Sequence, residues 1–237
     1  ITLIPGSGEF VYDTNVQHKI NGEEVAGSFA QAGNRVPINR HHPDSQANVK
    51  LALDQMQETL PNLEWVSVVV TWFGTSLDAG ECGIFPGVEY KTGGTTTPDT
   101  WACAGYTRNT AYAITHVNDS PRYGGTPDDA GVLRLLDELN DRGLKVMFYP
   151  MFFMDVENKP WRGRVTGSAA EVAAFFTKTN GYNRFVEYYA DLVKGKVDAF
   201  VIGSELIGLT KVTSGPGRYP AVEELIDLAA SVVDVLG

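Results

Sequence analysis

The residue best placed for acid–base chemistry in this sequence is Glu205, because it follows an apolar run directly. Residues 199–202 read Ala-Phe-Val-Ile, as in a strand buried on both faces, and Gly203 and Ser204 then precede the acid. Burying a carboxylate is costly unless the group is paired or used. In barrels of alternating strands and helices, catalytic groups lie at the C-terminal ends of strands. We therefore interpret Glu205 either as a catalytic acid or as an ion-paired loop residue.

A second acid, Asp155, follows another apolar run at residues 145–153. Retaining glycosidases use two carboxyl groups about 5–5.5 Å apart, and one of them is kept protonated by its surroundings. The candidates for the second carboxyl group are Asp155, Asp78 and Glu81. Asp155 ends the neighbouring strand of the predicted sheet, so it is the candidate that can lie beside Glu205. The alternative is a loop acid that pairs with Arg162 or Arg164.

Aromatic and polar side chains near these strand ends can supply a sugar-binding surface. Trp72, Tyr149 and Trp161 offer ring faces on which a sugar can stack. In the alternative interpretation, Trp72 fills the barrel and Trp161 packs its own loop. Arg162 can bind an acidic sugar or tie its loop to the second acid, and Ser204 is a further polar candidate for substrate binding.

The amino-acid composition and the net charge exclude some classes of binding partner. The 237 residues are 43% hydrophobic and 20% charged, which is ordinary for a globular protein. The formal net charge of −10 repels phosphate backbones, so we expect no nucleic acid partner. The sequence contains no apolar run of 18 residues, so we expect no membrane span.

Metal and cofactor sites are not expected. The four histidines show no ligand spacing, and a CxxC pattern is absent. No GxGxxG follows a predicted strand, so the dinucleotide-binding fold lacks its fingerprint. Cys82 and Cys103 lie in one loop-like region, where they either form a local disulfide or remain free.

The segments that must position the candidate residues fall into two parts. Residues 1–43 are rich in Gly, Asn and Pro and contain short β-like pieces at 9–12 and 25–30, the second being a candidate first strand. From residue 44 to residue 237, apolar strands alternate with amphipathic helices. The remaining strands are predicted at 65–73, 145–153 and 199–202.

The helices are predicted from apolar residues at helical spacing and from their start signals. Residues 126–129 (Thr-Pro-Asp-Asp) mark one start, and residues 168–171 (Ser-Ala-Ala-Glu) read as a capping box. The predicted helices cover residues 46–60, 126–142, 168–176, 182–194 and 219–236.

Residues 74–127 interrupt this alternation with a stretch dominated by Gly, Thr, Pro and Asp. A connection of this length is usually a functional insertion rather than a plain link. Within it, residues 84–90 and 111–117 are expected to pair as a hairpin.

Apolar strands that alternate with helices predict an α/β fold with a parallel sheet and right-handed crossovers. A complete (β/α)8 barrel takes about 250 residues. If the piece at 25–30 is the first strand, this chain supplies strands 1–4. We therefore expect the first half of a TIM-barrel-like architecture with a long insertion after strand 2. The second half is expected beyond residue 237 or from a partner that covers the open sheet.

Six motifs stand in one order along the chain: Val69-Val-Thr-Trp-Phe-Gly74, Cys82-Gly-Ile-Phe-Pro-Gly-Val-Glu89, Tyr123-Gly-Gly-Thr-Pro127, Tyr149-Pro-Met151, Pro160-Trp-Arg-Gly-Arg164 and Ile202-Gly-Ser-Glu-Leu206. Together they resemble the TIM-barrel-like domain of gene transfer agents. That family is found in large tail proteins of gene transfer agents and tailed phages, often labelled host-specificity proteins. The resemblance covers residues 44–237, and residues 1–30 resemble the segment just upstream in those proteins.

The resemblance implies a fold and an activity. The family is similar to glycoside hydrolases with a (β/α)8 barrel, whose acid/base Glu ends strand four and whose nucleophile Glu ends strand seven. Glu205 matches the acid/base, Ser204 stands where those hydrolases usually have Asn, and the nucleophile would lie beyond Gly237. The implied function is a domain that engages or hydrolyses a cell-envelope glycan. The alternative is a non-catalytic structural or host-recognition module of the tail tip.

The same resemblance implies a setting for the protein. We expect it in the tail of a phage-like particle produced in the bacterial cytoplasm, with a cell-envelope carbohydrate and other tail proteins as partners. Because the nucleophile is not in this chain, we expect the chain alone to be inactive. A retaining, two-carboxylate glycosidase is expected only if a second half completes the barrel.

Overall fold

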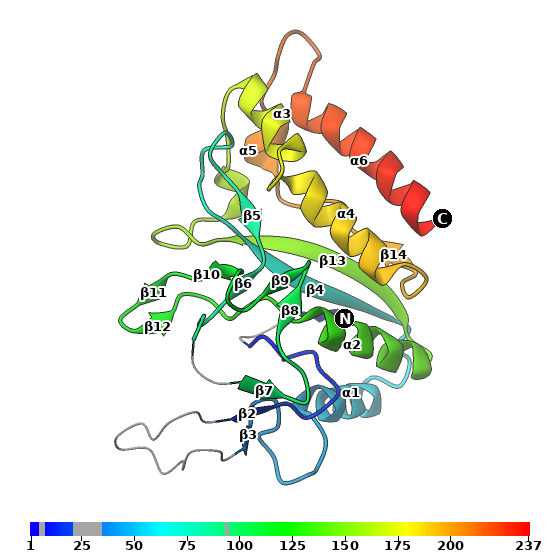
Figure 1. Cartoon of the computed structure of the whole chain (residues 1–237). Coiled ribbons are helices and arrows are strands. Elements are labelled where there is room, and N and C mark those ends of the chain that lie inside the picture. The colour runs from blue at the N-terminus through cyan, green and yellow to red at the C-terminus, as the bar shows by residue number, and fades with distance from the viewer. Residues whose placement is uncertain (5–7, 21–34, 93–94) are drawn as a thin grey trace.

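Two long parallel strands form the centre of the molecule. The computed structural model describes residues 1–4, 8–20, 35–92 and 95–237. Strands β4 (Trp65–Gly74) and β13 (Lys145–Met154) pair along their whole length, from Trp65 beside Lys145 to Gly74 beside Met154. Figure 1 shows them running side by side between the helices and the irregular green segment. The strands predicted at 65–73 and 145–153 are thereby confirmed.

Shorter strands extend this sheet on both sides. The strand β1 (Thr2–Leu3) pairs with β4, and β14 (Ala199–Phe200) pairs with β13, both in parallel. The order β1-β4-β13-β14 follows the chain, as expected for a sheet built by successive right-handed crossovers. The expected α/β fold with a parallel sheet is confirmed. The first strand is β1, whereas the predicted strand at 25–30 lies outside the described residues.

The strands present two faces with different surroundings. On β13, Val146, Phe148 and Phe152 are buried against the helices, whereas the alternate residues Tyr149 and Phe153 are only half-buried. Strand β4 is buried on both faces from its second residue onward. Residues 199–202, predicted to be buried on both faces, are half-buried. In the described part of the chain, β14 pairs with a strand on one side only.

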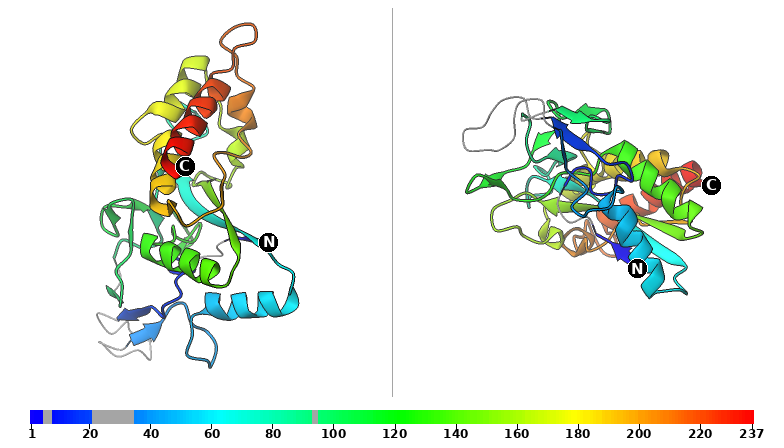
Figure 2. Two further views of the ribbon diagram at one scale, coloured as in Figure 1. Left: turned by 90° about the vertical axis from the view of Figure 1, so that its right-hand side faces the viewer. Right: turned by 90° about the horizontal axis from the view of Figure 1, so that it is seen from below.

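Helices cover one face of the sheet. Helices α2 (Asp129–Asp141) and α4 (Tyr182–Val193) pack on β13, and α6 (Pro220–Leu236) packs across α4 and α3 (Ala169–Thr177). Figures 1 and 2 show α3, α4 and α6 grouped together, with α1 (Asn48–Thr59) apart from them. None of the helices in the described ranges combines the length and apolar character that a membrane span requires.

The helix start signals are confirmed with one correction. Ser168 and Glu171 form the predicted capping box of α3, and Pro220 begins α6. Helix α2 is capped by Asp128, which accepts from the backbone N–H of Gly131, and not by Thr126. The Thr126 hydroxyl has another use, described next.

The outer edge of β4 is closed by side chains where no strand of the described residues covers it. The hydroxyl of Tyr12 lies 2.8 Å from the backbone oxygens of both Leu3 and Val69. The hydroxyl of Thr126 donates to the backbone oxygen of Thr71 at 2.8 Å. Buried backbone oxygens need such partners, so these two side chains continue the edge beyond β1. Farther along, β5 (Ile84–Phe85) pairs with β4 in the antiparallel direction.

The insertion folds into small pieces rather than the predicted hairpin. Strand β6 (Gly87–Val88) pairs in parallel with β10 (Tyr112–Ala113), so residues 84–90 and 111–117 lie together but run in the same direction. The other small sheets are antiparallel: β8 (Ala102–Cys103) with β9 (Tyr106–Thr107), β11 (His116–Val117) with β12 (Ser120–Pro121), and β2 (His18–Ile20) with β3 (Arg35–Pro37) and β7 (Thr95–Thr97). Cys82 and Cys103 are both buried and free, so the disulfide alternative is wrong.

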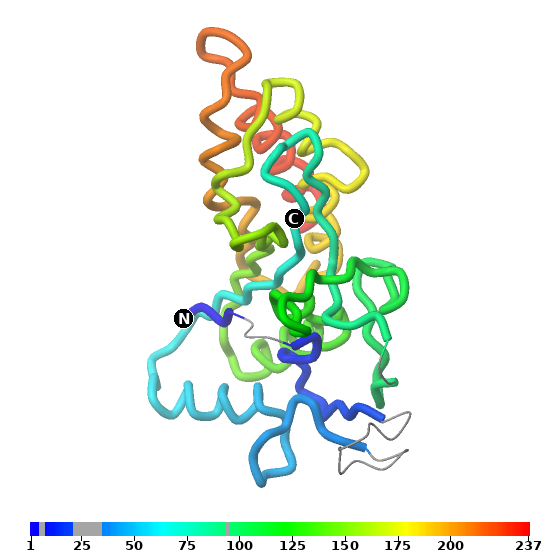
Figure 3. Tube along the Cα trace, turned by 90° about the vertical axis from the view of Figure 1, so that its left-hand side faces the viewer, coloured from blue at the N-terminus to red at the C-terminus, as the bar shows by residue number. Residues whose placement is uncertain are grey.

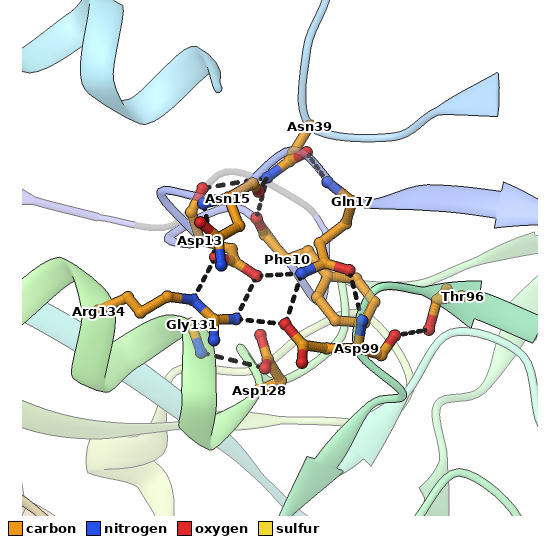
Figure 4. A network of polar contacts seen from close by, with 10 residues as sticks. All are labelled: Phe10, Asp13, Asn15, Gln17, Asn39, Thr96, Asp99, Asp128, Gly131 and Arg134. Carbon is orange, nitrogen blue, oxygen red and sulfur yellow. Dashed lines mark hydrogen bonds and ion pairs between the residues drawn. The ribbon is translucent and has the colours of Figure 1, made fainter. Parts of the chain in front are cut away.

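The N-terminal segment is anchored by the polar network in Figure 4. Residues 9–12, predicted as a β-like piece, form a turn that leads to Asp13. The carboxylate of Asp13 is buried and accepts from Arg134 of α2 at 2.7 and 2.6 Å and from Gln17 at 2.7 Å. Arg134 and Gln17 each donate also to Asp99 of the insertion at 2.7 Å. One arginine thereby joins the N-terminal segment, the insertion and α2. At the other end of this segment, the backbone nitrogen of Ile1 donates to the backbone oxygen of Trp65 at 3.0 Å. Figure 3 shows the N-terminal end of the chain beside the beginning of β4.

Candidate functional site

Glu205 lies in the loop that follows β14, at the C-terminal end of the parallel strands. Its backbone adopts a left-handed conformation with φ of 57°, which is uncommon for a residue with a side chain. The side chain is 52% exposed, and its Oε2 atom accepts from the indole Nε1 of Trp161 at 2.9 Å. The same oxygen lies 2.6 Å from Nη2 of Arg162. In the described part of the chain, Oε1 has no hydrogen-bond partner.

Arg162 connects Glu205 to the end of the sheet. Its side chain is only 8% exposed. The guanidinium donates to the backbone oxygen of Ser204 at 3.3 Å and to the Ser204 hydroxyl at 3.0 Å. That hydroxyl also contacts the phenol of Tyr149. Five predicted site residues therefore lie in one chain of contacts, which we call the rim cluster: Tyr149, Trp161, Arg162, Ser204 and Glu205.

Three elements position the rim cluster. Tyr149 projects from the half-buried face of β13, and Trp161 precedes the short 3-10 helix η1 (Arg162–Arg164). Helix α5 (Ile207–Thr210) begins just after Glu205 and packs on η1. The approach is possible because residue 208 is glycine. A Cβ there would lie 2.2 Å from the backbone oxygen of Val165 and 2.6 Å from that of Gly163.

Trp161 presents an exposed aromatic surface next to the carboxylate. The residue is 48% exposed, and its ring packs against Gly163, where a Cβ would lie 2.5 Å from ring atoms. An indole that is half exposed beside a carboxylate forms a surface on which a sugar ring can stack. The hydroxyl groups of the sugar can then donate to the carboxylate oxygens.

Trp72 does not join the rim cluster. It is fully buried and lies on the face of β4 opposite to that of Tyr149, because neighbouring side chains along a strand alternate. Its indole donates to the hydroxyl of Tyr189 at 2.8 Å, and its ring packs against Phe185 of α4. This position contradicts the predicted sugar platform and also the alternative that Trp72 fills the barrel. The ring belongs to the core between the sheet and the helices.

The buried carboxylate of Asp155 binds the insertion to the end of β13. Its Oδ2 atom accepts from the Tyr112 hydroxyl and from the backbone N–H of Thr115, both at 2.8 Å. Its Oδ1 atom lies 3.1 Å from Nη1 of Arg122. Burial, together with the bond to Asp155, raises the pKa of Tyr112 to about 12. Asp155 is therefore the ion-paired acid of the alternative interpretation, but its partner is Arg122 and not Arg162 or Arg164.

The two predicted acids are not brought into contact. Among the described residues, the partners of Asp155 all come from the insertion, and those of Glu205 come from the loop around η1. The side chain of Asp155 is fully buried, with both oxygens bonded. Asp155 therefore offers no free carboxylate to a substrate at Glu205. Within the described ranges, no group of three acidic, histidine or cysteine side chains is arranged to hold a metal ion.

The comparisons place the C-terminal part of the chain in a known context. Residues 180–237 match the family model of the GTA TIM-barrel-like domain. This match covers β14, the Glu205 loop and α6, and it confirms the resemblance for these residues, whereas the motifs before residue 180 lie outside it. The matched family is described as TIM-barrel-like, in agreement with the fold expected from the sequence.

Two solved structures of a GH113 β-1,4-mannanase, one of them a complex, are also similar to the chain. Both give a TM-score of 0.45 at 17% sequence identity, over 78% of this chain and 45% of the mannanase chain. This chain therefore spans less than half the length of those proteins. No curated protein matches the sequence.

Some polar residues that organise the structure were not singled out from the sequence. Asp13 and Arg134 are 121 residues apart and meet in the network of Figure 4. Glu9, Glu89 and Arg108 meet in a similar way at the base of the insertion. Isolated charged residues in irregular segments carry no periodic signal. The apolar strands before Glu205 and Asp155 did give such a signal.

Proposed function

We propose that this chain is a glycoside-hydrolase-like domain of a phage or gene-transfer-agent tail protein and that it engages a cell-envelope glycan at the rim cluster. The observation that carries the proposal is the meeting of Glu205 and a half-exposed Trp161 at the end of parallel strands. Sugars are commonly held by an aromatic face and a polar group beside it. The family match at residues 180–237 supports the same assignment.

Binding without turnover suits the geometry of this chain better than hydrolysis. A general acid must present a proton to the glycosidic oxygen, but Trp161 and Arg162 both donate to Oε2 of Glu205. A retaining mechanism also needs a second carboxylate within about 5.5 Å, and the predicted one, Asp155, is fully buried. We therefore expect hydrolysis only if another part of the protein supplies a nucleophile and displaces Arg162.

A purely architectural module of the tail is the second candidate. It is favoured by the ion pair of Glu205 with Arg162, which occupies one oxygen of the carboxylate. Such a module would keep the parallel sheet and contact other tail proteins without binding sugar. In either case we expect the protein in the tail of a phage-like particle, which mass spectrometry of purified particles tests directly.

The deciding experiment is a binding assay of the full chain on an array of peptidoglycan, capsule and lipopolysaccharide fragments. We expect Trp161→Ala to weaken binding by about tenfold or more, the value of one lost stacking contact. Trp65→Ala is the matched control, because Trp65 is 40% exposed at the opposite end of β4. Equal binding by both variants, or no binding by the unmodified chain, would leave the architectural module as the better assignment.

Catalysis is tested separately. We expect no release of reducing sugar from any bound glycan by this chain, and we expect Glu205→Gln to leave that result unchanged. Sugar release that disappears in the Glu205→Gln variant would instead establish a hydrolase and contradict our expectation of an inactive chain.

A further inference from the structure

A cavity with both polar and apolar walls lies away from the rim cluster, between the N-terminal segment and the insertion. Its volume is about 480 Å³, and none of the five residues of the rim cluster lines it. Glu9 and Lys19 line it from the N-terminal segment, and Glu89 and Arg108 line it from the insertion. Three residues of the network in Figure 4 also contribute to its walls: Phe10, Asn39 and Thr96. We call it the N-terminal cavity.

One wall of the N-terminal cavity is a fixed ion pair. Arg108 binds Glu9 with both terminal nitrogens: Nη1 lies 2.9 Å from Oε1, and Nη2 contacts Oε2. Oε1 also accepts from the backbone N–H of Glu89 at 3.0 Å. Gly125 allows this arrangement, because a Cβ there would lie 2.3 Å from Cγ of Glu9. Glu9 is therefore held in one position and its charge is already balanced.

The carboxyl group of Glu89 is only partly used by hydrogen bonds within the described part of the protein. Its Oε1 atom accepts from the backbone N–H of Gly125 at 3.2 Å. In the part of the chain that the structure describes, its Oε2 atom has no hydrogen-bond partner. Partial burial raises the pKa of Glu89, and the nearby charge of Glu9 raises it further, whereas the bond from Gly125 lowers it.

The charges around the cavity restrict what can bind in it. An anion would meet the carboxyl groups of Glu9 and Glu89, and a cation would meet Arg108 and Lys19. A metal ion needs several free oxygen ligands, but Arg108 occupies both oxygens of Glu9. An apolar ligand would cover these polar groups without bonding them, which is costly. A neutral ligand with many hydroxyl groups satisfies donors and acceptors alike.

We propose that the N-terminal cavity binds a neutral sugar, with the Glu89 carboxyl group and the Arg108–Glu9 pair as its principal hydrogen-bonding groups. This site does not depend on Glu205. It would give the domain a second sugar contact, made by its N-terminal segment and its insertion rather than by the ends of the strands.

The proposal is tested by saturation-transfer NMR on the full chain with D-glucose, D-mannose, D-galactose and N-acetylglucosamine, each added alone. We expect at least one to bind with a Kd on the order of 1 mM, as for a small ligand held by a few hydrogen bonds. Glu89→Leu removes both oxygens, and we expect its affinity to fall about tenfold or more. Glu58→Leu, at an exposed position of α1, is the matched control and is expected to bind normally.

A milder variant keeps the test valid if Glu89→Leu does not fold. Glu89→Gln preserves the shape and the acceptor for Gly125, and we expect its affinity to fall by about threefold because one ligand-facing oxygen becomes a donor. Unchanged binding in the folded Glu89 variant overturns the proposal, as does the absence of binding by all four sugars. Displacement of the sugar by inorganic phosphate or by trimethylammonium would also overturn it, because it would show a site for charged ligands.

The two proposals fail independently. Loss of glycan binding in Trp161→Ala alone would support the rim cluster and argue against the N-terminal cavity. Loss in Glu89→Leu alone would support the cavity and argue against the rim cluster.

Discussion

The guanidinium of Arg162 holds Glu205 and Ser204 at the same time, with Nη2 lying 2.6 Å from the carboxylate and 3.0 Å from the serine hydroxyl. A single buried arginine thus fixes the loop that leaves β14 as well as the acid at its end. The left-handed backbone of Glu205 is held in place by these bonds, since a left-handed conformation costs about 1–2 kcal/mol for a residue with a side chain. The position of the candidate acid therefore depends on Arg162.

Replacing Arg162 should loosen this loop. We expect Arg162→Met to lower the free energy of unfolding by about 1–3 kcal/mol, because the hydrogen bonds to Ser204 are lost while the half-exposed Glu205 can turn to water. Urea unfolding measures the change. Arg164→Met is the control, since Arg164 is exposed, and it should shift stability by no more than about 0.5 kcal/mol. Equal effects of the two substitutions would contradict the role assigned to Arg162.

The close contact between α5 and η1 predicts an intolerance of Ala at position 208. The added Cβ would lie 2.2 Å from the backbone oxygen of Val165, so one of the two segments has to move. We expect Gly208→Ala to cost about 1–3 kcal/mol in thermal or urea unfolding. It should also change the fluorescence of Trp161, which lies next to η1.

Gly215 provides the matched control for this prediction. A Cβ at Gly215 meets no atom within 4 Å, so Gly215→Ala should change stability by no more than about 0.5 kcal/mol. A Gly208→Ala variant as stable as Gly215→Ala would mean that α5 and η1 are not packed as described.

The edge of β4 predicts a role for a single hydroxyl group. Tyr12→Phe keeps the buried ring but leaves the backbone oxygens of Leu3 and Val69 without their shared donor. We expect a loss of about 1–3 kcal/mol in the free energy of unfolding. Tyr90→Phe, at an exposed tyrosine, should have little effect, and hydrogen exchange at β4 should accelerate only in the Tyr12 variant.

Asp128 predicts a pH dependence of stability. Burial is the main cause that raises the pKa of Asp128 from 3.8 to about 7, and nearby Asp13 adds to it. The folded protein therefore binds this proton more tightly than the unfolded chain does. The contribution of Asp128 to stability is largest below about pH 4 and is lost as the pH rises toward 7.

The Asp128→Asn variant tests this sign. Asn can still cap α2, but it cannot ionise. We expect the stability of the variant relative to the unmodified chain to rise by about 3 kcal/mol between pH 5 and pH 8, measured by urea unfolding. Asp141→Asn, at an exposed position of the same helix, should show no such trend. A constant difference between Asp128→Asn and the unmodified chain would contradict the raised pKa.

The sequence predicts most of what lies along the two long strands. Residues 65–73 and 145–153 carry continuous apolar runs, and such runs leave few alternatives to a buried parallel strand. The rim cluster was anticipated for the same reason, since side chains that follow neighbouring parallel strands meet at one edge of the sheet. The incorrect prediction for Trp72 also results from the continuous apolar run. A strand that is apolar at every position does not reveal which face each residue occupies.

The insertion and the N-terminal segment were harder to predict. Strands of two residues, such as β6 and β10, are too short for any periodic pattern, so their parallel pairing could not be foreseen. The partner of Asp155 was missed because Arg122 lies 33 residues earlier, in a segment without regular structure. Pairing of this kind is decided by tertiary packing and not by local sequence.

The contact between Arg134 and Asp13 spans 121 residues of the chain. Ile1 likewise meets Trp65 across 64 residues. Contacts between such distant positions stabilise the chain only after a long loop has been closed, which costs conformational entropy. Chains that are rich in such contacts fold slowly. The pairing of β4 with β13 also joins distant positions, such as Trp65 and Lys145. We therefore expect the whole chain to fold slowly, with its central strands and its N-terminal segment both waiting for long loops to close.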